Sequence, residues 1–216
     1  TNGLMGTISN YRFTSVALLT LAIFAAVSGS ITEPLPLTWR QALGYAPTDL
    51  LQLDIHRLFT SLCVTAGAGK FIASFLMLAF AVGGCERMLG SWPTLRFFLA
   101  SHITILLFMS CVILLAGRVT GTPESLALAT GRDIGPSAGY YGCLGIVLAS
   151  LPPRWRFGSL LVVMIVLAIR LWISSEHVLE EPTVVSADLA HILAVPLGWA
   201  AHATGLCVGR ERKKQA

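Results

Sequence analysis

The sequence predicts an all-α membrane protein built as a bundle of six transmembrane helices. Hydrophobic residues make up 55% of the 216 residues and charged residues only 12%, whereas an ordinary soluble domain carries about 25% charged residues. The apolar residues also fall in runs close to the length of about 20 residues that a membrane helix needs. We therefore expect a single domain, residues 1–216, embedded in a lipid bilayer.

Six apolar segments are expected to span the bilayer: 13–31, 58–84, 95–116, 137–151, 157–173 and 187–207. Prolines end the first and the fourth segments, at Glu33-Pro34-Leu35-Pro36 and Leu151-Pro152-Pro153, because proline cannot continue a helix. Residues 34–56 are too polar to span and carry aromatic side chains suited to the interface. We expect this stretch to form a partly helical loop on the bilayer surface.

The remaining segments differ in length and in the polar residues they carry. The fourth is only about 15 residues, or about 22 Å, long, which is too short for a hydrocarbon layer of about 30 Å, so its start should lie below the surface. His102 in the third segment is interpreted as a packing or interface residue. Arg170 lies near the end of the fifth segment, where a long side chain can snorkel to the interface. A basic run, 209–214, follows the sixth.

Arginine and lysine are distributed unevenly between the two ends of the expected bundle. Six spans put both termini on one side, which carries nine of these residues, whereas the other side carries four. Positive residues concentrate on the cytoplasmic side, so we expect both termini in the cytoplasm, with a bacterial inner membrane as the default location. The net charge of +4 comes from residues beside the spans, so no nucleic-acid partner is expected.

The five cysteines are scattered, and most lie inside apolar segments. This pattern is typical of small apolar packing residues and indicates neither a disulfide framework nor a metal site. We expect no metal and no cofactor.

The fourth segment opens with Gly135-Pro136-Ser137-Ala138-Gly139. Proline suits the first turn of a helix, so Ser137 should lie at a helix N-terminus, where backbone N–H groups and the helix dipole favour negative charge. That position suits a nucleophile whose reaction develops an oxyanion. The alternative is a glycine-rich packing helix with an incidental serine, because Gly-x-Ser-x-Gly is short and common.

Three polar residues of the apolar segments are expected at similar depth. The second, fourth and sixth segments all begin at the outer face, with Lys70 early in the second, Ser137 opening the fourth and His191 one turn into the sixth. A polar residue inside a span is costly to bury and is by default functional.

Small residues give the sixth segment a face that can pack closely on the glycines of the fourth. This packing would bring His191 within hydrogen-bond reach of Ser137, where it could accept the serine proton and return it to a leaving amine. The alternative is a helix-packing hydrogen bond without catalysis. Asp188 lies one turn before His191 and is a candidate for orienting the imidazole, although no acidic residue is an obvious third member. The small residues are Ala190, Ala194 and Gly198.

These motifs together resemble the rhomboid family of intramembrane serine proteases, over a stretch from about His56 to Gly198. The matching residues are Gly135 to Gly139 for the nucleophile motif, Tyr141 for an aromatic residue that packs on the catalytic histidine, Ala190-His191 with Gly198 for the last helix, His56-Arg57-Leu58-Phe59-Thr60 for the start of the second helix, and Glu86 with Leu89-Gly90-Ser91 for the turn after it.

The resemblance implies a rhomboid-like six-helix bundle that cleaves transmembrane substrates near the outer membrane face. Ser137 would be the nucleophile and His191 the general base, with Gly135 and Tyr141 in support. The family's His-x-x-x-Asn oxyanion pair falls on Lys70 and Ser74 of this sequence. Losing an oxyanion donor typically costs about 10²–10³ in rate, so this departure bears directly on activity.

Lys70 leaves three interpretations open. It could donate to the oxyanion, act as an alternative base if burial lowers its basicity, or snorkel outward without a catalytic role. The alternative function is therefore a catalytically inactive rhomboid-like protein that binds transmembrane segments or serves as a subunit of a membrane complex. A small transporter ranks last, because the sequence lacks paired inverted repeats and broken helices.

Overall fold

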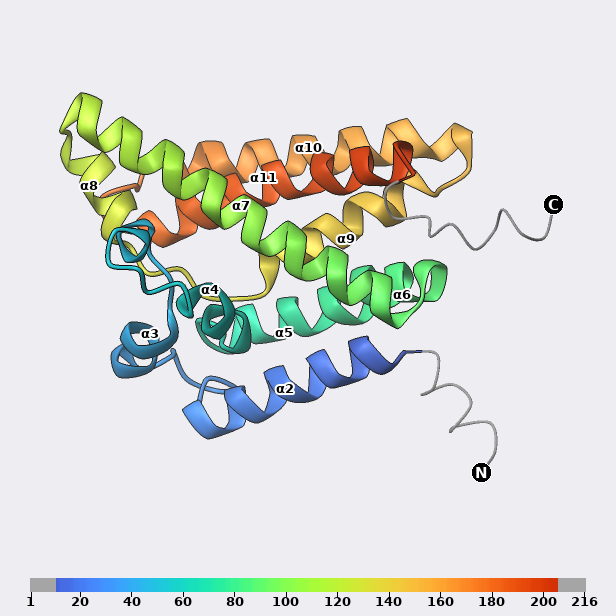
Figure 1. Ribbon diagram of the computed structural model, residues 1–216, viewed down its shortest axis with the longest axis horizontal. Helices are drawn as coiled ribbons and strands as arrows, with labels where there is room; N and C mark the ends of the chain where they lie inside the picture. The colour runs from blue at the N-terminus through green and yellow to red at the C-terminus, as the bar shows by residue number, and fades with distance from the viewer. Residues whose placement is uncertain (1–10, 206–216) are drawn as a thin grey trace.

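The computed structural model describes residues 11–205, and this part of the chain is helical without a β-strand. Figure 1 shows the long helices running side by side as one bundle. The helices that cross it are α2 (Arg12–Ser28), the continuous stretch of α5 (Ala68–Met77), the π-helical η3 (Leu78–Val82) and α6 (Gly83–Leu89), and then α7 (Ser91–Thr120), α9 (Ser137–Ala149), α10 (Pro153–Ser175) and α11 (Pro182–Ala203). The predicted all-α membrane bundle is confirmed.

Four of these crossings are long and apolar enough to span a membrane: Ala68–Leu89, Ser91–Thr120, Pro153–Ser175 and Pro182–Ala203. The other two, α2 and α9, are apolar but shorter. The 13 residues of α9 extend about 20 Å at 1.5 Å each, and Figure 1 shows α9 beginning part-way along the bundle. The same view places the start of α2 and the end of α11 at one end of it.

The second crossing begins at Ala68, not near Leu58 as the apolar run indicated. Residues before it form the short helices α4 (Arg57–Thr60) and η2 (Ser61–Cys63). The guanidinium of Arg57 donates hydrogen bonds to the carbonyl oxygens of Gln41, Ala42 and Gly44, at 2.7, 3.0 and 3.3 Å. These bonds hold α4 in the loop, and Gly67, with a φ of +132°, separates it from the span.

The loop over residues 34–56 is partly helical, as expected, with α3 (Leu37–Leu43) and η1 (Pro47–Leu50). The buried carboxylate of Asp49 accepts two hydrogen bonds from Arg132, at 2.8 and 3.0 Å, and one from the Ala46 N–H. Tyr45 and Asp133 exchange backbone hydrogen bonds of 3.0 and 2.8 Å. The loop is thereby fixed to the connection that leads into α9.

The third crossing also differs from the expected one at both ends. Helix α7 extends on both sides of residues 95–116, and α8 (Pro123–Thr130) follows it, with the Thr122 side chain accepting from the Ser125 N–H at 3.3 Å. The expected end of the sixth segment, at 207, and the basic run 209–214 lie outside the described residues.

Glu86 fixes α2 to the second crossing. Its buried carboxylate accepts hydrogen bonds from the Phe13 and Thr14 N–H groups, both at 2.8 Å, and from the Thr14 hydroxyl at 2.6 Å. The first N–H groups of a helix have no partner within it, and an anion there is further favoured by the helix dipole. The start of α2 is therefore satisfied inside the bundle.

Helix α9 lies at the centre of the bundle, in contact with α7, α10 and α11. Its closest neighbour is α11, because Gly198 of α11 faces Gly142 and Gly145 of α9 with no side chain between the backbones. Ala194 and Val195 of α11 are fully buried. The predicted packing of the small-residue stripe on the glycine face is confirmed, and it fixes the spacing of the two helices that carry Ser137 and His191.

Candidate active site

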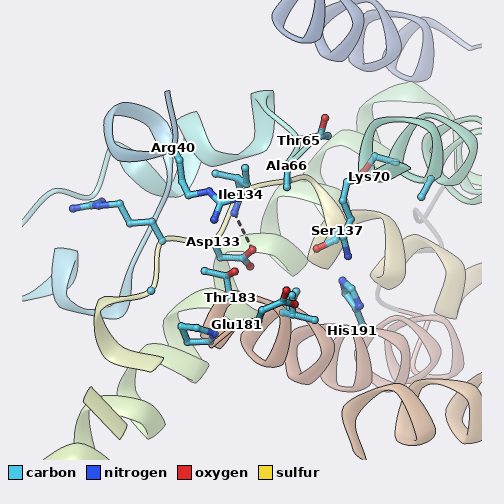
Figure 2. A pocket seen from close by; sticks show the side chains of 18 of the residues that line it. Arg40, Thr65, Ala66, Lys70, Asp133, Ile134, Ser137, Glu181, Thr183 and His191 are labelled. Atoms are coloured by element: carbon cyan, nitrogen blue, oxygen red, sulfur yellow. Dashed lines mark hydrogen bonds between the residues drawn. The ribbon is translucent and has the colours of Figure 1, made fainter. Parts of the chain in front are cut away.

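A cavity of about 680 Å³ lies among α5, α9, α10 and α11 and the connection before α9. All six candidate residues named from the sequence line it, together with charged residues of the surrounding loops. The six are Lys70, Ser74, Gly135, Ser137, Tyr141 and His191. In Figure 2 the labelled side chains of Lys70, Ser137 and His191 point toward one another.

Ser137 is the first residue of α9 and follows the N-cap residue Pro136. Gly135 has a φ of +122°, a conformation that favours glycine, and its N–H donates to the Ser61 carbonyl oxygen at 2.8 Å. This turn places the hydroxyl of Ser137 in the cavity at the N-terminal end of α9. The N–H groups of the first helical turn have no intrahelical partner, so they can stabilise a negative charge there.

His191 lies in α11 and is only 6% exposed. Its ring stacks on that of Tyr141, with centroids 4.1 Å apart and an interplanar angle of 31°. Neither ring nitrogen has a hydrogen-bond partner among residues 11–205, so Ser137 and His191 are in one cavity without a hydrogen bond between them. Catalytic hydrogen bonds are often long before substrate binds and tighten in the complex.

Lys70 and Ser74 come from α5, where they are one turn apart on the face toward Ser137. Lys70 reaches into the cavity (Figure 2), while Ser74 is buried at 5% exposure. An ammonium group provides three hydrogen-bond donors and a hydroxyl one. The two residues therefore bring donors and a positive charge to the side of the cavity opposite α11.

Asp133 lies in the connection before α9 and lines the same cavity. Its carboxylate accepts a hydrogen bond from the Ile134 N–H at 2.8 Å, drawn in Figure 2. Burial raises the pKa of Asp133 to about 6, although this hydrogen bond and the positive charges of Lys70 and Arg40 oppose the rise. The rim of the cavity thus carries a carboxyl group that titrates at mildly acidic pH.

Arg170, which lies near the end of an apolar run, has a partner on the neighbouring helix. Its Nη2 lies 2.8 Å from Oδ1 of Asp188, so the side chain forms an ion pair between α10 and α11. Sequence reasoning missed this pair because nothing local shows which side chain of α11 faces Arg170. His102, in contrast, is the predicted packing residue: it is buried and its Nε2 lies 3.1 Å from the Leu58 carbonyl oxygen.

No group of three or more His, Cys, Asp or Glu side chains in the described part of the chain is arranged to hold a metal ion. The groups that the cavity lining brings near one another include the Ser137 hydroxyl, the His191 imidazole and the Lys70 ammonium group, at the start of α9.

Comparison with protein families gives one match, to the Rhomboid domain, over residues 52–210. No curated protein and no solved structure matches the chain. The matched stretch contains every candidate residue in the cavity and all of its lining except Arg40, and the long apolar helices beside the cavity are those of an integral membrane protein. Because the family model covers more than half of the 216 residues, the chain belongs to the rhomboid family.

Proposed function

We propose that this protein is an intramembrane serine protease that uses Ser137 as nucleophile and His191 as general base. The observation that carries the proposal is the contact of α9 with α11: glycine backbones meet there, and both side chains line one cavity. Membership of the rhomboid family supports the same reading.

In the proposed reaction the Ser137 hydroxyl attacks the carbonyl carbon of the scissile peptide bond and passes its proton to His191. The tetrahedral intermediate then breaks its C–N bond, and His191 returns the proton to the leaving amine. Water, activated by the same imidazole, hydrolyses the acyl-enzyme and restores the Ser137 hydroxyl. The Tyr141 ring holds the plane of the imidazole during these transfers.

The negative charge of the intermediate would be stabilised by N–H groups of the first turn of α9 and by Lys70, with Ser74 as a further donor. Lys70 points toward Ser137 in Figure 2, which favours this role over outward snorkelling. A fixed donor at a developing oxyanion is worth about 10²–10³ in rate, and an ammonium group adds a full positive charge.

Transmembrane proteins are the proposed substrates, cleaved near the outer membrane face. Among the four long crossings α10 is the least buried, and the cavity is lined by Met77 of α5 on one side and Arg170 of α10 on the other. A substrate segment can therefore approach the cavity from the bilayer between α5 and α10. The proposed location is a bacterial inner membrane with both termini in the cytoplasm.

The test uses the full chain reconstituted into lipid vesicles, a fluorophosphonate probe that labels activated serines, and a panel of single-span transmembrane substrates. The parent, Ser137→Ala and His191→Ala are compared with Ser150→Ala. Ser150 is a matched control because it caps the opposite end of α9 and donates only to the Val147 carbonyl oxygen and toward the Met88 sulfur.

We expect the parent and Ser150→Ala to be labelled and to cleave, and both activities to be lost in Ser137→Ala and His191→Ala. A parent protein that is folded yet unlabelled in every lipid composition contradicts the proposal. That result would instead support a protein that binds transmembrane segments without cleaving them.

A further inference from the structure

One oxygen atom of Asp188 lies between the guanidinium of Arg170, on a neighbouring helix, and the imidazole of His191, on its own helix. Its Oδ1 is 2.8 Å from Nη2 of Arg170 in α10 and 3.6 Å from Nδ1 of His191, one turn along α11. The Asp188 side chain is 1% exposed and that of His191 7%, whereas the Arg170 side chain is 41% exposed. The carboxylate therefore lies inside the bundle, and the arginine reaches it from the outer side.

Burying a carboxylate is costly unless its oxygens are paired and hydrogen-bonded. Oδ1 of Asp188 and both ring nitrogens of His191 lack a geometrically sound hydrogen bond within residues 11–205. These unsatisfied atoms are neighbours, since Oδ1 and Nδ1 are 3.6 Å apart. That distance is too long for a hydrogen bond, but a shift of less than 1 Å would bring the two atoms into hydrogen-bond range.

We propose that Asp188 is a positioning residue for His191, held in place by Arg170, and this inference rests on the proposed function. Asp188 accepts the Nδ1–H of the imidazole, so that Nε2 is the unprotonated nitrogen that faces Ser137. When His191 takes the serine proton at Nε2, the carboxylate stabilises the resulting imidazolium. The site then contains three members, Ser137, His191 and Asp188, rather than two.

The competing interpretation is that the ion pair only ties α10 to α11. The two interpretations predict different effects on stability and on rate when Asp188 or Arg170 is replaced. A tie that is lost costs only stability, more when Arg170 is replaced than when Asp188 is, because the carboxylate left behind is buried, and the rate per active molecule is unchanged. A positioning residue makes Asp188 far more important to the rate than Arg170, because only Asp188 contacts the imidazole.

The kinetic test compares kcat and KM of Asp188→Asn, Arg170→Gln and the double variant, with active protein counted by probe labelling. The amide NH₂ of asparagine can donate to Nδ1 and so favours the wrong tautomer. We expect kcat of Asp188→Asn to fall by about 10²–10⁴, the range of general-base catalysis, with KM little changed and Arg170→Gln falling less than tenfold. Glu176→Gln, an exposed loss of one negative charge at the end of α10, is the matched control and should retain full kcat.

A second measurement does not depend on activity. In protein labelled with ¹⁵N at histidine, the His191 signals are assigned by their loss in His191→Ala, and their shifts report which ring nitrogen carries the proton. We expect the neutral ring to carry it on Nδ1 in the parent, and to lose this preference in Asp188→Asn. If Asp188→Asn does not fold alone, the double variant, which removes both charges, replaces it in both measurements.

An unchanged tautomer in the Asn variant overturns the inference, whether or not the protein is a protease. An unchanged kcat in an active protein overturns it equally. A parent that shows the Nδ1–H tautomer but no labelling of Ser137 upholds the role of Asp188 and contradicts the proposed protease function, so the two failures are distinguishable.

Discussion

Replacing Gly198 with alanine should separate the two helices that carry the proposed catalytic residues. A Cβ at this position would lie 2.9 Å from the carbonyl carbon of Gly142 and closer still to its oxygen, whereas ordinary contacts begin at 3.4 Å. The obstructing atoms are backbone, so no side chain can rotate away. The contact with the carbonyl carbon alone requires α9 and α11 to move apart by about 0.5 Å, the difference between 3.4 and 2.9 Å, and the nearer oxygen requires more. Such overpacking costs about 1–3 kcal/mol.

A cost of about 1–3 kcal/mol corresponds to a fall of about 2–12 °C in Tm for a chain of this size. The same displacement acts on Ser137 and His191, and a misplacement of about 1 Å can reduce a catalytic rate by about 10². The assay is thermal unfolding in detergent, followed by the rate of fluorophosphonate labelling per folded molecule. We expect both values to fall in Gly198→Ala.

Gly158→Ala is the matched control, because Gly158 lies in the exposed face of α10 and an added Cβ there meets nothing within 4 Å. Alanine is better than glycine in a helix by about 1 kcal/mol, so this variant should melt at the parent temperature or above it. If Gly198→Ala melts and labels like Gly158→Ala, the glycine contact does not set the spacing of the two residues, and the reasoning is refuted.

Two further predictions concern residues that line the cavity, and a third concerns the loop over residues 34–56. Lys70→Met, which keeps the length of the side chain and removes its charge, should slow labelling of Ser137 by about 10²–10³, while Lys70→His retains more of the rate; labelling kinetics measure both. Asp133→Asn should gain Tm relative to the parent as pH rises from about 4 to about 7. Burial raises the pKa of Asp133 from 3.8 to about 6, so between these values the folded parent holds a proton that the unfolded chain releases. The stability that this carboxyl group gives the parent is complete below about pH 4 and is lost as pH rises through about 6. Asp49→Asn removes the negative charge and leaves one acceptor oxygen for the two N–H groups of Arg132, so it should cost about 2–3 kcal/mol, measured by thermal unfolding.

Each of these predictions has an outcome that contradicts it. Full labelling in Lys70→Met would mean that the ammonium group does not reach the oxyanion. A Tm difference between Asp133→Asn and the parent that stays constant with pH would show that this carboxyl is ionised alike in folded and unfolded chains. An Asp49→Asn variant as stable as the parent would mean that the loop over residues 34–56 is held by its backbone contacts alone.

The membrane fold could be predicted from the sequence because a transmembrane helix depends on local composition. An apolar run long enough to cross the bilayer forms a helix wherever its neighbours lie. The start of the second crossing could not be predicted in this way. Residues 58–63 are as apolar as a span, and what keeps them out of it is the set of hydrogen bonds from Arg57 to carbonyl oxygens of residues 41–44.

The proximity of Ser137 and His191 was predictable for a related reason. Glycines on one helix and small residues on another identify a close contact, and similar depth brings the polar residues on them together. Nothing in the sequence indicated that Asp188 and Arg170 form a pair. An arginine near the end of an apolar run has the same local sequence whether it reaches the interface or an acid on the next helix, and only the packing of α10 on α11 distinguishes the two.

Three carboxylates in the described chain are buried to 1% exposure or less, and they are satisfied in different ways. Glu86 accepts the N–H groups at the start of α2, and Asp49 accepts the fork of Arg132 and a backbone N–H. Both are saturated, which is what a structural role requires, since a buried acceptor left unpaired costs about 1–3 kcal/mol. Oδ1 of Asp188 has the ion pair with Arg170, at 2.8 Å, but no hydrogen bond of sound geometry, and the imidazole of His191 beside it has no hydrogen-bond partner within the described residues. A buried carboxylate that is ion-paired with Arg170 and lies beside an imidazole without a hydrogen-bond partner is better explained by a role in holding that imidazole than by the stability of the resting fold alone.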